Sequence, residues 1–128
     1  MFGRRRIESI APRAACDRFF TGELVLVDVR TRLEYERIRV PRAIHIPLME
    51  VSSRLGELPV DHPVAFLCRS GHRSALAART VARHRIDVLN VCGGMNAWLA
   101  AGLPTSDCPA ARSPRRPNPT PKEPICTT

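Results

Sequence analysis

The chain has 128 residues, of which 44% are hydrophobic, so it can form one domain with its own core. The formal net charge of +8 comes largely from the two ends, and the middle of the chain carries only about +3. Because aromatic residues are also scarce, we expect no specific nucleic-acid partner.

Short aliphatic segments alternate with helical segments along residues 7–104. In chain order, the pattern predicts strands at 6–10, 24–29, 43–46, 64–68 and 87–91 and helices at 12–20, 31–37, 47–58, 74–84 and 94–102. Strands that are apolar along their whole length and alternate with helices are typical of a parallel sheet covered on both faces. The predicted fold class is therefore α/β, in a single domain.

The two ends differ in composition from this domain. Residues 1–6 form a basic N-terminal segment, and residues 105–128 are rich in proline and arginine with few aliphatic side chains. Such a tail cannot bury enough apolar surface to fold, so we expect it to be disordered. No apolar run is long enough to cross a membrane or to form a secretory signal, which favours a reducing, cytoplasmic location.

The cysteine count limits the chemistry. An odd number of cysteines without an export signal argues against a disulfide framework. None of them has the spacing of a zinc site, so we expect no metal or cofactor. The remaining options are one reactive thiol or several inert ones among Cys16, Cys68, Cys92, Cys108 and Cys126.

Cys68 stands where a predicted strand gives way to a helix, which we expect to begin at Ser74. In parallel sheets ligands collect at the carboxyl ends of strands, and the free N–H groups of a helix N-terminus attract anions. Gly71 permits a tight loop, and Arg69 and Arg73 add positive charge. These features favour a thiolate, so we predict a lowered Cys68 pKa and a sulfur that is open to solvent.

The sequence resembles rhodanese-like domains, the sulfurtransferases, over almost all of residues 7–104. Four segments occur in the order and spacing of that family: "LVLVDVRTRLEYE", "VPRAIHIP", "VAFLCRSGHRSALAA" and "CGGMNAW". The resemblance implies a rhodanese-like fold with a five-stranded parallel sheet. It also implies that Cys68 is catalytic, taking sulfane sulfur from a donor and passing it on from a persulfide to cyanide, a thiol or a protein acceptor.

The same resemblance implies that the loop after Cys68 cradles the transferred sulfur. The implied substrate-binding residues are Arg69, Ser70, Gly71, His72, Arg73 and Ser74. The two arginines would draw in a small anionic donor such as thiosulfate, and Arg73 can also brace the loop backbone.

Three further residues border the predicted site. Asp28 and Arg30 end a strand on the same rim, where we favour ion pairing with Glu34 or loop anchoring over substrate contact. Cys92 precedes two glycines, at a position where the family more often has a polar residue. It is either a space-filling residue or a resolving thiol that forms a disulfide with oxidised Cys68.

The segment 38–43, "IRVPRA", also departs from the family pattern of glycine-histidine-isoleucine-proline-glycine-alanine. Ile38, Arg39 and Arg42 replace the first glycine, the histidine and the second glycine. Because these positions lie in a connection, we expect an altered loop shape and unchanged chemistry.

Two rival functions follow from the same residues. Cysteine phosphatases and arsenate reductases also close a cysteine loop with an arginine at a helix N-terminus, but five residues separate their cysteine and arginine, and four do so here. A rhodanese-like domain can also be a non-catalytic interaction or regulatory module. The presence of Cys68 argues against that function.

Overall fold

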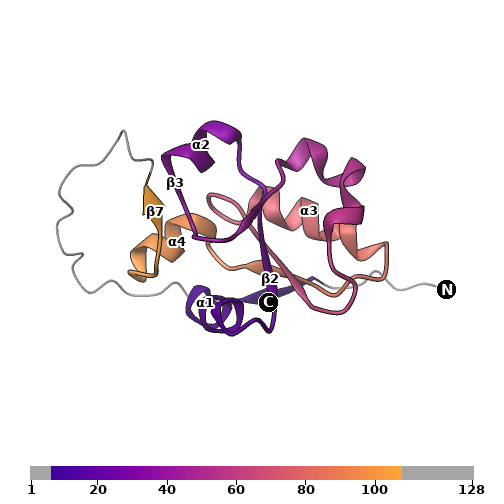
Figure 1. The fold of residues 1–128 in the computed structure, drawn as a ribbon, viewed down its shortest axis with the longest axis horizontal. Coiled ribbons are helices and arrows are strands. Elements are labelled where there is room, and N and C mark those ends of the chain that lie inside the picture. The colour runs from indigo at the N-terminus through magenta and orange to yellow at the C-terminus, as the bar shows by residue number, and fades with distance from the viewer. Residues whose placement is uncertain (1–6, 108–128) are drawn as a thin grey trace.

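The computed structural model describes residues 7–107 and contains a five-stranded parallel sheet with helices packed against it (Figure 1). The basic segment 1–6 and residues 108–128 of the predicted tail lie outside the described residues. The strand order is β1-β6-β5-β2-β4. The five strands are β1 (Glu8–Ile10), β2 (Val25–Asp28), β4 (Ile44–His45), β5 (Val64–Leu67) and β6 (Val88–Val91). The predicted α/β fold with five parallel strands is therefore confirmed.

The helices largely follow the predicted segments. They are α1 (Pro12–Phe20), α2 (Arg32–Arg37), α3 (His72–Ala82) and α4 (Gly94–Ala100). α3 begins at His72 rather than at Ser74, so the cysteine loop is shorter than the sequence pattern predicted. The segment 47–58 forms two 3₁₀ helices, η1 (Leu48–Ser53) and η2 (Leu55–Glu57), because its serines and glycine are poor α-helix formers.

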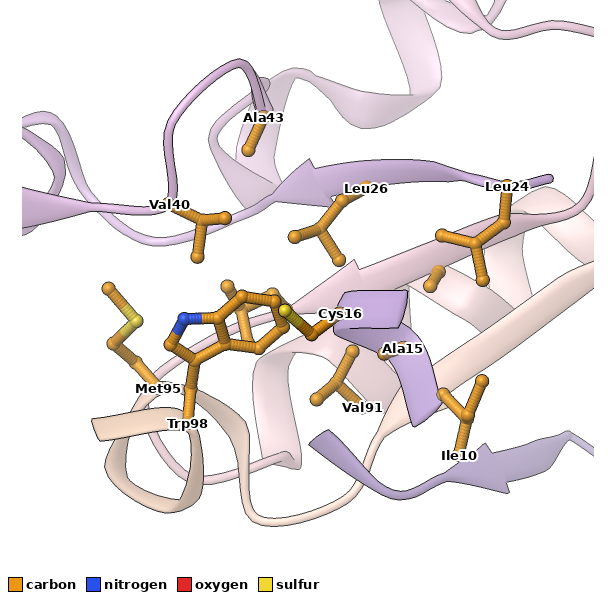
Figure 2. Close-up of a cluster of buried hydrophobic side chains, with 12 residues drawn as sticks. Ile10, Ala15, Cys16, Leu24, Leu26, Val40, Ala43, Val91, Met95 and Trp98 are labelled. Carbon is orange, nitrogen blue, oxygen red and sulfur yellow. The ribbon is translucent and has the colours of Figure 1, made fainter. Parts of the chain in front are cut away.

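The alternation of side chains along the strands divides the core into two layers, and α1 and α3 lie on opposite sides of the sheet (Figure 1). One layer joins the sheet to α1 and α4 around Trp98, which is fully buried and donates its Nε1–H to the carbonyl of Pro104 at 2.9 Å. Figure 2 shows Cys16 and Met95 beside the Trp98 ring. The other layer packs α3 and η1 against the sheet, and Cys68 belongs to this layer.

A second, smaller sheet was not predicted from the sequence. β3 (Ile38–Arg39) pairs antiparallel with β7 (Ser106–Asp107). The sequence pattern places the start of a disordered tail at residue 105, whereas this pairing orders the chain through residue 107. Within residues 7–107 no helix is both long and apolar enough to span a bilayer.

Candidate active site

The candidate site is the cysteine loop, defined here as residues 68–73, which follows the central strand β5 and includes the first two residues of α3. The Cys68 Sγ accepts a hydrogen bond from the Gly71 N–H at 3.0 Å and lies 3.2 Å from the Ser74 Oγ. Gly71 caps α3 with φ 108°, in the left-handed region that residues with a Cβ resist. The glycine therefore allows the loop to turn its amides toward the sulfur, as the sequence predicted for a tight loop.

The start of α4 holds the other side of the cysteine loop. The N–H of Met95 donates to the Cys68 carbonyl at 2.6 Å, and the N–H of Asn96 donates to the Arg69 carbonyl at 3.0 Å. A Cβ on Gly94 would lie 2.7 Å from the Arg69 carbonyl carbon, so only glycine permits this approach. These contacts direct the Cys68 and Arg69 carbonyls toward α4 and away from the sulfur.

The hydrogen bonds at Cys68 favour the thiolate. Burial is the largest single influence and raises the pKa of the thiol, but hydrogen bonds from the Ser74 hydroxyl and from the amides of Ser74, Gly71 and Ser70 together outweigh it. The pKa of Cys68 therefore lies below its ordinary value, in the predicted direction. Hydroxyl and main-chain donors are the main cause of this lowering. From the sequence we expected the charges of Arg69 and Arg73 to contribute to it as well.

The predicted exposure of Cys68 is wrong. The residue is only 1% exposed and packs in the core layer under α3, with Phe66 and Ala77 in the same cluster. The physical reason is that the donors that stabilise the thiolate also surround it. Sulfur chemistry at Cys68 therefore requires the reacting atom of a partner to enter under the cysteine loop.

Arg73 is paired with Glu34 of α2. Its two terminal nitrogens donate to the two carboxylate oxygens at 2.7 and 3.0 Å, and both side chains are half-buried. The Arg73 hydrogen bond is the main reason that the pKa of Glu34 falls to about 2. Glu34 also completes a capping box with Thr31, so this pair ties the start of α3 to the start of α2.

Asp28 and Arg30 form a separate buried pair at the end of β2. The Arg30 guanidinium donates to both oxygens of Asp28 and to the Ile38 carbonyl at 2.6 Å. The contact with Glu34 reaches only its backbone carbonyl, at 3.4 Å, because the Glu34 carboxylate binds Arg73. Arg30 thus ties the end of β2 to the start of β3, so the pair anchors neighbouring segments of the chain, as the sequence favoured.

The remaining predicted residues lie around the loop. Arg69, Ser70 and His72 are exposed, and the Ser70 Oγ lies 3.2 Å from the His72 Nδ1. Cys92 is disulfide-bonded, which the cysteine count did not predict, whereas Cys68 is a free thiol. The two cysteines are therefore not bonded to each other, and a resolving role for Cys92 stays a prediction.

The sequence pattern missed Asn90 of β6. Its Oδ1 accepts from the Ser74 hydroxyl at 2.5 Å, and its Nδ2 donates to the Gly71 carbonyl at 3.2 Å. The signal was present, because Asn90 is a single amide in an otherwise aliphatic strand. Among the described residues no cluster of three or more His, Cys, Asp or Glu side chains is arranged to hold a metal ion.

Comparison with known proteins agrees with the family resemblance of the sequence. The rhodanese-like domain family model matches residues 12–101. The chain is 37% identical over 98 residues to a sulfurtransferase of Allochromatium vinosum, covering 76% of this chain and 88% of that protein. It is 42% identical over 76 residues to YrkF of Bacillus subtilis, covering 59% of this chain but only 41% of that longer protein.

A solved structure agrees in fold. The rhodanese-related protein of Thermoplasma volcanium superposes with a TM-score of 0.72 and 25% identity, over 77% of this chain and 97% of that one. The family model, the sulfurtransferase relative and this structural neighbour agree on one assignment, and the chain belongs to the rhodanese-like domain family.

Proposed function

We propose that the protein is a thiosulfate sulfurtransferase of the rhodanese type, with Cys68 as the nucleophile and no cofactor. The observation that carries the proposal is a free Cys68 thiol that accepts from the Gly71 N–H at 3.0 Å and whose pKa is lowered by hydrogen bonds from the Ser74 hydroxyl and from the amides of Ser74, Gly71 and Ser70. The relation to a protein named a sulfurtransferase agrees with it. The proposal requires Cys68 as a free thiol, which it is. We also propose a cytoplasmic location, although the disulfide at Cys92 is unusual in a reducing compartment.

The first half-reaction transfers one sulfur atom to the enzyme. The Cys68 thiolate attacks the outer sulfur of thiosulfate, the Sγ–S bond forms, and the S–S bond of the donor breaks, so that sulfite leaves with the electron pair. The inward amides of the cysteine loop stabilise the negative charge that remains on the outer sulfur of the persulfide.

The second half-reaction returns the enzyme to its starting state. A nucleophile such as cyanide or a thiol attacks the outer sulfur, the Sγ–S bond breaks, and its electron pair returns to Cys68 as thiolate. No external oxidant or reductant is needed. A protein thiol or persulfide can serve as acceptor or donor by the same chemistry.

The loop residues have different proposed roles. Arg69 is exposed beside the loop and is suited to attract an anionic donor, while Ser70, Gly71 and Ser74 supply donors to the sulfur. Arg73, held by Glu34, braces the loop, and His72 lies at the rim.

The test combines activity with mass measurement. The full chain mixed with thiosulfate and cyanide is expected to release thiocyanate. Incubation with thiosulfate alone is expected to add one sulfur atom to the peptide containing Cys68, and reduction should remove it. Cys68→Ser should abolish both results, whereas Cys16→Ser is the matched control because Cys16 lies in the opposite core layer. A Cys68→Ser variant with parental activity would disprove the proposal.

The burial of Cys68 favours one rival, the non-catalytic rhodanese-like module. Alkylation separates the two functions, because an enzyme must admit a small reagent to the sulfur. Under the enzyme proposal, iodoacetamide labels Cys68 in the folded protein faster at higher pH. If Cys68 of the folded protein resists even this small reagent and no thiocyanate forms, the protein is a non-catalytic rhodanese-like module.

A further inference from the structure

The Ser74 hydroxyl lies between two groups that both attract its hydrogen. Its Oγ is 3.2 Å from the Cys68 Sγ and 2.5 Å from the Asn90 Oδ1. A hydroxyl has one hydrogen to donate, and Ser74 is fully buried, so bulk water does not complete the network. Ser74 therefore cannot donate to the sulfur and to the amide at the same time.

The orientation of the Asn90 amide decides which acceptor receives that hydrogen when Cys68 is neutral. The Nδ2 of Asn90 donates to the Gly71 carbonyl at 3.2 Å. A flipped amide would place Oδ1 against that carbonyl and leave two acceptors facing each other. The Oδ1 therefore faces Ser74, and because it can only accept, Ser74 donates to it.

This arrangement turns the lone pairs of the Ser74 Oγ toward the sulfur. A neutral Cys68 S–H can donate to these lone pairs, but a thiolate would be repelled by them. The Ser74 hydroxyl helps to lower the pKa of Cys68 only when its hydrogen points at the sulfur. Ionisation of Cys68 therefore requires the hydroxyl to turn away from Asn90.

We propose that Asn90 is a positioning residue that competes with Cys68 for the single hydroxyl hydrogen of Ser74, so that the charge on the sulfur sets the direction of the hydroxyl. In the thiolate the hydrogen points at Sγ. In the thiol it points at Asn90.

The consequence for catalysis rests on the proposed sulfurtransferase function. In the persulfide the negative charge lies on the outer sulfur, and Sγ is bonded to two atoms and neutral. The Ser74 hydrogen then returns to Asn90. Asn90 thus favours the thiol and the persulfide over the thiolate, and it lowers the cost of moving the charge from Sγ to the outer sulfur.

Charged and titratable groups lie around the site, but in the described residues none of them touches the Ser74 hydroxyl. On the loop and α3 these are Arg69, His72 and Arg73, and from α2 and β2 they are Glu34, Asp28 and Arg30. Because none of them bonds to Ser74 or Asn90 in the described residues, we expect them to keep their positions when either residue is changed. Comparison of variants at these two positions therefore isolates the hydrogen-bond competition.

The test is the pH dependence of Cys68 alkylation by iodoacetamide in the full chain, followed by mass analysis of the Cys68 peptide. Asn90→Ala frees the hydroxyl for the sulfur and should lower the Cys68 pKa by about 0.5–1 unit, the worth of roughly one hydrogen bond. Ser74→Ala should raise it by a similar amount. The double variant should match Ser74→Ala, because Asn90 acts only through the hydroxyl, and Ser74→Thr should restore the parental value.

A purely structural role for Asn90 predicts the opposite sign. If Asn90 only holds the Gly71 carbonyl, Asn90→Ala would loosen the loop and raise the pKa of Cys68, with or without Ser74. A raised or unchanged pKa in Asn90→Ala would overturn the proposal, and Asn90→Leu, which keeps the branched shape of the side chain without its hydrogen-bonding groups, repeats the test if the alanine variant does not fold. The alkylation profile needs no sulfur donor, so its result is independent of the thiocyanate assay.

Discussion

The ion pair between Arg73 and Glu34 predicts a measurable loss of stability in Glu34→Gln. Glutamine keeps the shape of the side chain and can still accept from the Thr31 N–H, so the capping box of α2 survives. The substitution therefore removes the charge that Arg73 binds and little else. This makes it a direct measure of the link between the cysteine loop and α2.

The pKa shift of Glu34 gives the magnitude. Its pKa falls from 4.5 to about 2, and a shift of that size corresponds to at most about 3 kcal/mol of stability. The two side chains are 32% and 28% exposed, so solvent screening reduces the contribution. We expect Glu34→Gln to lower the free energy of unfolding by about 1 kcal/mol at neutral pH.

The sign of the pH dependence follows from the lowered pKa. A carboxylate with a depressed pKa stabilises the fold above its unfolded pKa of 4.5, and this contribution is lost as the pH falls toward about 2. The difference between parent and Glu34→Gln should therefore be full at neutral pH and shrink steadily below pH 4.5.

Urea unfolding of both proteins at several pH values measures this difference. Glu36→Gln is the matched control, because Glu36 lies on the same helix but pairs with an Arg32 that is 84% exposed. We expect that control to change stability by less than about 0.5 kcal/mol. Equal stability losses in the two variants, or a Glu34→Gln loss that does not depend on pH, would refute the reasoning.

Two further substitutions test the backbone geometry. Gly94→Ala places a Cβ 2.7 Å from the Arg69 carbonyl carbon at φ 58°. We expect this variant to be less stable by about 2 kcal/mol or more in thermal unfolding and to form less persulfide. Unchanged stability and persulfide formation would show that the close contact between α4 and the cysteine loop is dispensable. Arg85 is exposed with φ 61°, and Arg85→Gly should raise the free energy of unfolding by about 0.5 kcal/mol in urea, whereas a loss would mean that this conformation carries no strain.

The sequence predicted the parallel sheet well because its signals are local. Each of the five strands is a short aliphatic run, and hydrophobic patterning alone identifies such runs. The antiparallel pairing of Ile38–Arg39 with Ser106–Asp107 joins segments far apart in the chain and has no local signal. Arg42 has a φ of 68°, the left-handed conformation that glycine adopts readily, so the backbone at this position still turns as a glycine would, and the expected change in loop shape at 38–43 stays a prediction.

The site was predicted in outline and missed in its long-range contacts. Cys68 and the glycine of its loop could be identified from the motif, because loop and helix start are contiguous in the chain. The partners Glu34 and Asn90 come from α2 and β6, and only the folded sheet brings them to the loop. The exposure of Cys68 was wrongly predicted because its burial depends on how closely the loop and α3 pack over the sulfur, which the order of residues along the chain does not show.

The burial and the ionisation of Cys68 have one common cause. Amides can stabilise a thiolate only at hydrogen-bond distance, and a chain that brings several of them to one sulfur also covers that sulfur. In a persulfide the reactive atom lies about 2 Å farther out, at the length of an S–S bond. A bulky donor must reach the covered Sγ, whereas an acceptor meets the outer sulfur. The size of the donor should therefore limit the first half-reaction more strongly than the size of the acceptor limits the second.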